Sequence, residues 1–247
     1  MYGDKHLLAT QYPSMKAYVD YIRKTAGEQY IWKGGSIFGD WLYYKPKMEN
    51  HTEPDGYTAP DMIATAFYAY SAKLLAHAAH VLGKNDDNAT YTQVYEKVKA
   101  AFQKEYITSS GRVVSDSQTG YVLALHFDLL PDELRGKAVQ YLVEDIQARK
   151  NHLSTGFLGT PYICHVLSSN NRTSVGYDLL LQKSFPSWLF PVTMGATTIW
   201  ERWDGQKVDS TFQDVGMNSF NHYAYGAVGD WMYRVVAGIE VGSPGYK

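Results

Sequence analysis

Residues 60–83, PDMIATAFYAYSAKLLAHAAHVLG, are the stretch that decides the fold class of this chain. Apolar side chains recur in it every three or four residues, a spacing that places them on one face of an α-helix. Gly83 stands where a glycine commonly ends a helix. The stretch therefore predicts one long helix. Its expected buried stripe comprises Ile63, Phe67, Tyr70, Leu74, Ala78 and Val81.

Helical patterns of the same kind continue on both sides of this stretch, separated by turns such as the glycine-rich 33–36. No shift in composition marks a domain boundary, so we predict a single all-α domain over residues 1–247, with about eight helices and minor β pieces. The further helices are expected at about 14–25, 91–102, 119–129, 134–146, 160–168, 174–183 and 217–235, and the strand-like stretches at 29–38, 113–114 and 196–200.

Composition excludes several classes of function. The 23 Lys and Arg nearly balance the 25 Asp and Glu, for a net charge of −2, so the chain has no basic surface for nucleic acid. Apolar runs such as Ala64–Tyr70 are too short to span a bilayer. The single cysteine, Cys164, lies in an apolar helical pattern and is expected to be a buried structural thiol. We therefore expect neither a nucleic-acid nor a membrane partner.

The segment 195–205, GATTIWERWDG, carries the strongest chemical signal. Glu201 lies between Trp200 and Trp203, and a carboxylate beside indole faces is what a glycosidase needs to hold a sugar and move a proton. The alternative, to which we give equal weight, is an ion pair between Arg202 and Asp204 on an aromatic-rich loop.

Two further segments offer polar groups next to aromatic rings. Asn221 and His222 lie at the predicted start of the last helix and could bind sugar hydroxyls, although a histidine there is more often a capping or buried structural residue. Asp40 and Trp41 lie in a long loop that runs through Lys47 and Glu49. An aspartate after a glycine more often caps a helix or turn, so Asp40 alone is a weak signal.

Other reaction types leave no signature in this sequence. It contains no HExxH, CxxC, phosphate-binding glycine loop or GxSxG motif, and its eight histidines show no metal-ligand spacing. His77 and His80 are three residues apart on the 60–83 helix without an acidic partner, so we expect them at the surface. We therefore expect no metal and no cofactor.

Taken together, these segments resemble the catalytic domain of the α-L-rhamnosidases of glycoside hydrolase family 78. The match runs in order along nearly the whole chain, and several of the matching segments are long and unusual. They are 12–16 (YPSMK), 38–42 (FGDWL), 64–68 (ATAFY), 118–125 (QTGYVLAL), 155–162 (TGFLGTPY) and 186–189 (PSWL), followed by the Glu201 and His222 segments.

The resemblance implies an (α/α)6 barrel, in which six helical hairpins surround a funnel, and no cofactor. It also implies removal of terminal α-L-rhamnose by an inverting mechanism, in which an acid protonates the leaving oxygen while a base activates water. Glu201 would match the family's general base. Asp40, Trp41, Trp203 and His222 would line the rhamnose subsite, and Asn221 adjoins it.

One departure from the family limits this expectation. The family's general acid lies in an acidic segment upstream of the part that corresponds to residues 2–4, and this sequence has no counterpart of it. With about eight helices instead of twelve, we expect a barrel truncated on its N-terminal side. Its exposed apolar faces would favour a homo-oligomer or a complementing chain.

Without a general acid, cleavage of an ordinary glycoside should slow by roughly 10²–10⁴-fold, whereas an activated leaving group could still depart. Inversion also requires a second carboxylate about 6.5–9.5 Å from Glu201, for which Asp40 and Asp61 are the candidates within the chain. Two alternatives remain open: a fragment that binds carbohydrate without hydrolysing it, and an open barrel with a different hydrolase activity, on an ester or another glycoside.

Overall fold

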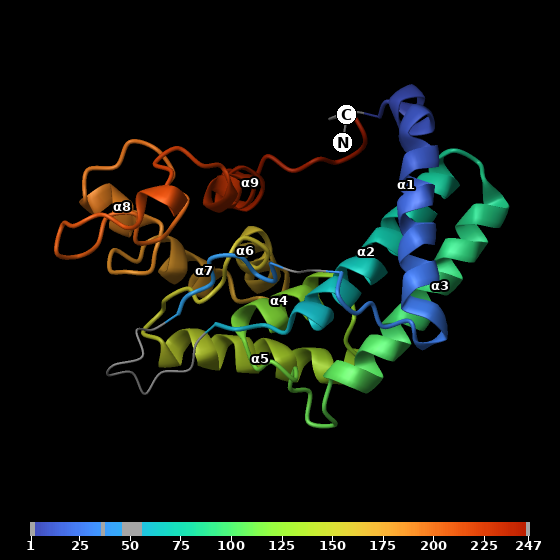
Figure 1. Ribbon diagram of the computed structural model, residues 1–247, viewed down its shortest axis with the longest axis horizontal. Coiled ribbons are helices and arrows are strands. Elements are labelled where there is room, and N and C mark those ends of the chain that lie inside the picture. The colour runs from blue at the N-terminus through green and yellow to red at the C-terminus, as the bar shows by residue number, and fades with distance from the viewer. Residues whose placement is uncertain (1–2, 36–37, 46–55, 246–247) are drawn as a thin grey trace.

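The computed structural model describes residues 3–35, 38–45 and 56–245, whose helices follow one another round an open arc (Figure 1). The predicted all-α character is confirmed. Lys47 and Glu49, through which the predicted long loop runs, lie outside the described residues. The helices are α1 (Lys5–Ala26), α2 (Pro60–Val81), α3 (Asn85–Tyr106), α4 (Gln118–His126), α5 (Asp132–Ala148), α6 (Thr160–Ser169), α7 (Thr173–Leu180), α8 (Leu189–Thr193) and α9 (Val228–Trp231), with short helical turns η1 (Gly27–Gln29), η2 (Val215–Met217), η3 (Ala224–Ala227) and η4 (Met232–Val236).

The long helices alternate between an inner and an outer layer. Helices α2, α4, α6 and α9 contact one another in succession, and α3, α5 and α7 each pack on the inner helix that precedes them. Helix α1 packs on α2 at one end of the arc. The chain is therefore a series of helical hairpins, and the loops that lead into the inner helices carry the predicted site segments.

Helix α2 confirms the long helix predicted at 60–83 and corrects its buried face. It begins with Pro60 in the first turn, where a proline needs no hydrogen-bond donor, and Gly83 beyond its end has φ +71°. Met62 and Leu75 are fully buried outside the predicted stripe, while Leu74 within it is 45% exposed. A single stripe was wrong because α2 is apolar nearly all round and contacts α1, α3 and α4.

The other long helices appear close to their predicted positions. Helix α1 extends further towards the N-terminus than the predicted 14–25, because Asp4 caps it by accepting a hydrogen bond from the Leu7 N–H at 3.0 Å. The buried side chains form one cluster that extends from α1 to α9. Cys164 is buried, and His77 and His80 are exposed, all as predicted.

The single helix predicted at 217–235 is wrong in its first half, whereas η3, α9 and η4 follow one another without a break from Ala224 to Val236. The chain forms η2, η3, α9 and η4 there, with an irregular segment between η2 and η3. That segment pairs with the Glu201 segment through the Glu201 N–H to the Ser219 carbonyl and the His222 N–H to the Ile199 carbonyl, both at 2.9 Å. These backbone groups cannot also join a helix, because each hydrogen bond already uses them.

Of the predicted strand-like stretches, 113–114 contributes one bridge residue, Val113, and the described residues of 29–38 and 196–200 form no strand. Over the ranges that the structure describes, β-type pairing is limited to two isolated bridges, Ile107 with Val113 and Gln206 with Phe212. None of the described helices is both long enough and apolar enough to cross a membrane.

Candidate functional site

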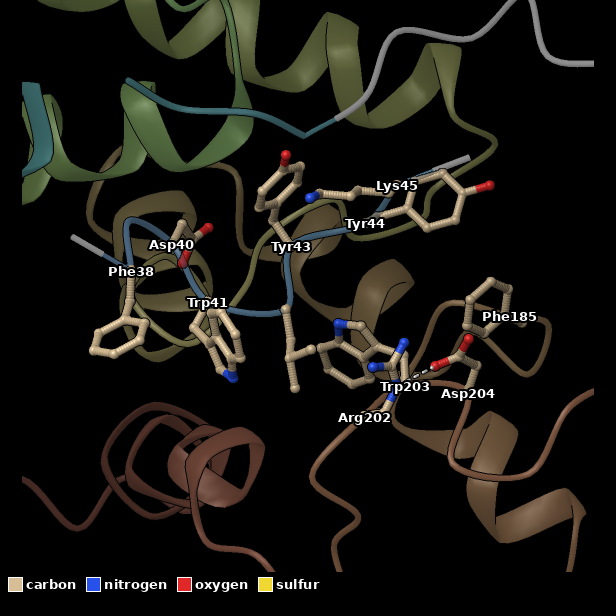
Figure 2. Close-up of a pocket in the computed structure, with 11 residues that line it drawn as sticks. Phe38, Asp40, Trp41, Tyr43, Tyr44, Lys45, Phe185, Arg202, Trp203 and Asp204 are labelled. Atoms are coloured by element: carbon tan, nitrogen blue, oxygen red, sulfur yellow. Dashed lines mark hydrogen bonds and ion pairs between the residues drawn. The ribbon is translucent and has the colours of Figure 1, made fainter. Parts of the chain in front are cut away.

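A cavity of about 290 Å³ opens where the 38–45 loop faces the Glu201 segment (Figure 2). Its volume is close to the lower end of the range for small-ligand pockets. Aromatic rings dominate its wall, with a few charged groups among them. The lining residues are Phe38, Asp40, Trp41, Leu42, Tyr43, Tyr44, Lys45, Phe185, Arg202, Trp203 and Asp204.

Asp40 is sealed into the protein at one edge of this cavity, with 2% of its surface exposed. Its two carboxylate oxygens accept hydrogen bonds from Thr119 Oγ1 at 2.5 Å, from the Gly156 and Leu158 N–H groups at 2.7 Å, and from the Gly159 N–H at 3.3 Å. Burial raises the pKa of Asp40, and these hydrogen bonds oppose the rise. Its contacts are those of a turn-fixing aspartate, the alternative that the sequence left open.

Two glycines allow the 155–159 turn to close round Asp40. A Cβ atom on Gly156 would lie 2.2 Å from the Trp41 carbonyl oxygen, and one on Gly159 would lie 2.2 Å from Thr119 Oγ1. The Phe157 N–H donates to the Trp41 carbonyl at 2.9 Å. The turn before α6 and the 38–45 loop therefore form one packed unit that fixes the backbone of Trp41.

The Trp41 ring is half-buried and lines the cavity, with Phe38 packed edge-on against it at 5.5 Å. Figure 2 shows the Trp41 indole pointing away from the Asp40 carboxylate. Because the indole is held from one side and open to the cavity, it can stack on a sugar ring.

Glu201 differs from Asp40 in having few internal contacts. Its backbone is fixed by the Ser219 carbonyl, and its Oε2 accepts one hydrogen bond from the Ser219 N–H at 2.9 Å. The side chain is half-buried, and Oε1 receives no hydrogen bond from the residues that the structure describes. Glu201 thus combines a fixed position with free acceptor capacity.

The ion pair that the sequence offered as an alternative is present next to Glu201. Arg202 Nε lies 3.1 Å from Asp204 Oδ1, and Gln213 donates to the other oxygen of Asp204. Both Arg202 and Asp204 face the cavity, as Figure 2 shows. The ion pair braces the loop after Glu201 and leaves the Glu201 carboxylate unpaired with a cation among the described residues.

Trp203 and His222 are held by neighbouring aromatic rings. Trp203 is 5% exposed and stacks on Tyr225 with ring centroids 3.8 Å apart. His222 is half-buried between Phe157, at 5.1 Å, and Tyr223, at 5.3 Å, with both rings stacked on it. Trp203 is therefore mainly a packing residue, although it lines the cavity.

The hydrogen bonding of His222 decides which ring nitrogen can serve a ligand. Its Nδ1 accepts from the Ala224 N–H at 3.3 Å, which leaves Nε2 as the protonated nitrogen of the neutral ring. Asn221 is exposed, its backbone bonds to Ser219 Oγ, and it does not line the cavity. Of the two residues predicted together, His222 therefore has a ring held by its neighbours, whereas Asn221 has an exposed amide.

The two candidates for a second carboxylate are both engaged in structural contacts. Asp40 is enclosed as described above, and Asp61 Oδ1 accepts a hydrogen bond from the Gly34 N–H at 2.9 Å at the start of α2. The described residues also contain no group of three or more His, Cys, Asp or Glu side chains that could hold a metal ion.

Several residues of the site were not singled out from the sequence, and Thr119, Phe157, Ser219 and Tyr225 are the ones that hold the predicted residues in place. The first two lie in segments that resembled the family, 118–125 and 155–162, so their segments were found without their roles. Ser219 acts through its backbone and Tyr225 through contacts that are distant in sequence, for which a single sequence carries no signal.

Comparison with known proteins places this arrangement among glycosidases. The sequence profile of the bacterial alpha-L-rhamnosidase six-hairpin glycosidase domain matches residues 1–236. Over the whole chain, the sequence is 45% identical to an alpha-L-rhamnosidase of Streptomyces avermitilis. Over 99% of the chain, it is 43% identical to an alpha-L-rhamnosidase of Formosa agariphila. The chain spans 22% and 26% of the lengths of these two proteins.

Solved structures give the same result. The crystal structure of the Streptomyces avermitilis alpha-L-rhamnosidase complexed with L-rhamnose matches 98% of this chain with a TM-score of 0.90 at 45% identity, over 22% of its own length. That of the Aspergillus terreus enzyme matches 99% of this chain with a TM-score of 0.90 at 34% identity, over 28% of its own length. The expected incomplete (α/α)6 barrel is thereby confirmed.

Proposed function

The chain belongs to the bacterial alpha-L-rhamnosidase six-hairpin glycosidase family, and from that premise we propose that it removes terminal α-L-rhamnose from rhamnosides. The observation that carries this proposal is the Glu201 carboxylate, which accepts one hydrogen bond, from the Ser219 N–H, and is otherwise unused among the described residues. Glu201 is not itself one of the residues that line the cavity, but it directly precedes Arg202 and Trp203, which do. Likeness to a structure complexed with L-rhamnose supports the choice of sugar. Since the helices share one core, we also propose that residues 1–247 act as one barrel domain, truncated relative to twelve helices.

In the proposed reaction, Glu201 is the general base of an inverting hydrolysis. Its carboxylate takes a proton from a water molecule as the water oxygen bonds to the anomeric carbon. The bond between that carbon and the leaving oxygen breaks with its electron pair on the oxygen, and an acid protonates the oxygen. The product is β-L-rhamnose. The proposal assigns the base to this chain and leaves the acid unassigned. Four internal donors fill the Asp40 carboxylate, and Asp61 lies at the start of α2, where it accepts from the Gly34 N–H and does not line the cavity.

The sugar-binding roles divide according to the contacts of each residue. Trp41 supplies a stacking face, His222 supplies its Nε2–H as a donor to a sugar hydroxyl, and Trp203 closes the cavity wall. Asn221 is an exposed amide next to His222 in sequence and is not among the residues that line the cavity. Asp40, which the family resemblance suggested as a sugar ligand, is proposed here as the residue that positions Trp41.

The experiment that tests this function compares the wild type with Glu201→Gln on 4-nitrophenyl α-L-rhamnoside, whose leaving group needs little protonation. Loss of a general base is expected to lower kcat by roughly 10²–10⁴-fold. Glu105→Gln, which changes an exposed glutamate on α3, is the matched control and should leave kcat unchanged. Full activity in Glu201→Gln would exclude its role as base, and proton NMR that detects α-L-rhamnose as the first product would exclude inversion.

Carbohydrate binding without hydrolysis is the second candidate, because four internal donors fill the Asp40 carboxylate and the proposal assigns no acid. Calorimetric titration with L-rhamnose distinguishes the two functions. Binding by the wild type, with no turnover even of the activated substrate, would favour the binding function over catalysis.

A further inference from the structure

Tyr225 contacts three separate segments of the site through three parts of its structure. Its hydroxyl donates to the Leu42 carbonyl oxygen at 2.9 Å, its ring stacks on Trp203, and its own carbonyl accepts from Trp188 Nε1 at 2.9 Å. Tyr225 lies in η3 and is 1% exposed. Its hydroxyl bond to Leu42 therefore joins two parts of the chain that are far apart in sequence.

The carbonyl that receives the hydroxyl belongs to a residue in an uncommon conformation. Leu42 has φ +57°, a left-handed backbone conformation. For any residue other than glycine, this conformation costs on the order of 1 kcal/mol or more. Such a conformation persists only where surrounding contacts hold it. Leu42 directly follows Trp41, so the backbone angle that Tyr225 helps to hold also sets the direction of the Trp41 ring.

The ring of Tyr225 connects to the two other functional segments. Trp203, on which it stacks, is two residues beyond Glu201 and is tied by its own Nε1 to the Thr155 carbonyl at 3.3 Å. Tyr225 also meets Phe157 edge-on at 5.2 Å, and Phe157 stacks on His222. One side chain thereby touches the supports of Trp41, Glu201 and His222.

We propose that Tyr225 is a positioning residue that holds the 38–45 loop and the Glu201 segment in a fixed arrangement relative to each other. Its hydroxyl would fix the position of Trp41, the proposed stacking face for the sugar, and its ring would fix the position of Glu201, the proposed base. This inference rests on the proposed function in so far as it names a sugar and a base. It assigns Tyr225 no contact with the substrate.

The hydroxyl is suited to a permanent structural bond. Burial, followed by the charge of Asp40, raises the pKa of Tyr225 well above its ordinary value, so the group stays a neutral donor over the working pH range. Removing the hydroxyl should therefore loosen the Leu42 carbonyl at any pH at which the enzyme is assayed, without changing the stacked ring.

The test is Tyr225→Phe, with Tyr95→Phe as the matched control. Tyr95 is also buried, at 6% exposed, and its hydroxyl also lies within reach of the carbonyl of a left-handed residue, Asp128 with φ +62°, at 3.1 Å. It lies on α3 and does not line the cavity. Both variants remove one buried hydroxyl, so a purely structural role predicts the same behaviour for both.

We expect Tyr225→Phe to weaken L-rhamnose binding and raise KM by about 3–10-fold, the worth of one hydrogen bond, while kcat changes less than about twofold because the ring stack remains. Amide hydrogen exchange at Tyr43 and Phe157, whose N–H groups bond to the Asp40 and Trp41 carbonyls, should accelerate by a similar factor. Tyr95→Phe should change neither quantity.

Equal L-rhamnose binding and equal hydrogen exchange in Tyr225→Phe and Tyr95→Phe would overturn the inference. If the wild type binds rhamnose, faster exchange in Tyr225→Phe without weaker binding would also overturn it. If the wild type neither binds nor hydrolyses rhamnosides, the proposed function fails, and hydrogen exchange alone decides the role of Tyr225. Accelerated exchange confined to Tyr225→Phe then supports it, and unchanged exchange rejects it.

Discussion

Two acidic residues of the site, Asp40 and Glu201, differ in burial and in how many hydrogen bonds their carboxylates accept. Asp40 is 2% exposed, and its carboxylate is filled by one hydroxyl and three backbone N–H groups. Glu201 is half-buried, and its carboxylate accepts one backbone N–H from the described residues. The family resemblance implies a role for each, Glu201 as general base and Asp40 in the rhamnose subsite, and their contacts in the structure now separate them.

The difference shows which carboxylate can act on a substrate. An acceptor that is already filled by internal donors has no lone pair left for water or a sugar hydroxyl, whereas a fixed but unfilled carboxylate can accept a proton. Under the proposed function, Asp40 would act through the backbone that it holds, and Glu201 through its own carboxylate oxygens. If this division is correct, mutation should affect stability at the first residue and chemistry at the second.

The largest expected effect is on the stability of Asp40→Ala. The substitution leaves several buried donors unpaired, each worth about 1–3 kcal/mol, so the free energy of unfolding should fall by about 3–5 kcal/mol. Urea denaturation followed by circular dichroism measures it. Asp178→Ala, on the exposed side of α7, is the control and should stay within about 0.5 kcal/mol. If Asp40→Ala lowered the free energy of unfolding by less than about 1 kcal/mol, the structural role of Asp40 would be contradicted.

The next largest effect is expected in the 155–159 turn, whose backbone N–H groups bind Asp40, and it tests how tightly this turn packs against the 38–45 loop. In Gly156→Ala, the new Cβ would lie 2.2 Å from the Trp41 carbonyl oxygen and 2.7 Å from that of Asp40, so the loop must shift, at a cost of about 1–3 kcal/mol. L-rhamnose binding should weaken with it, because Trp41 moves. Gly136→Ala, in α5, meets no atom within 4 Å and should instead stabilise the protein by about 0.5–1 kcal/mol. Equal unfolding midpoints in the two variants would contradict the close packing of the turn.

The sequence predicted the long helices well and their faces less well. Helix α2 was located to within its capping residues because proline, glycine and a sustained apolar period are local signals. Its buried face was misassigned at Leu74, because the face depends on which helices pack against α2, and this is information from distant parts of the chain. The first half of the helix predicted at 217–235 failed for a related reason, since pairing of Ser219 and His222 with the Glu201 segment overrides their local preference.

The candidate site shows the same division between local and distant information. Glu201, His222 and Trp41 could be found because an acid or an imidazole beside aromatic residues is visible within a few positions. The role of Asp40 could not be decided, because its donors at Thr119 and Gly156 are far along the chain. Tyr225 resembled any other tyrosine of the 21 in the sequence until its partner Leu42 was known.

The smallest expected effect completes the comparison at Glu201. Glu201→Gln keeps the size of the side chain and an acceptor oxygen for the Ser219 N–H, in a half-buried position that water reaches, so the free energy of unfolding should change by less than about 0.5 kcal/mol. The same urea titration used for Asp40→Ala measures it. A loss of 2 kcal/mol or more, about what a buried unpaired group costs, would show that Glu201 supports the fold as Asp40 does, and any loss of activity in the variant would then no longer identify a base.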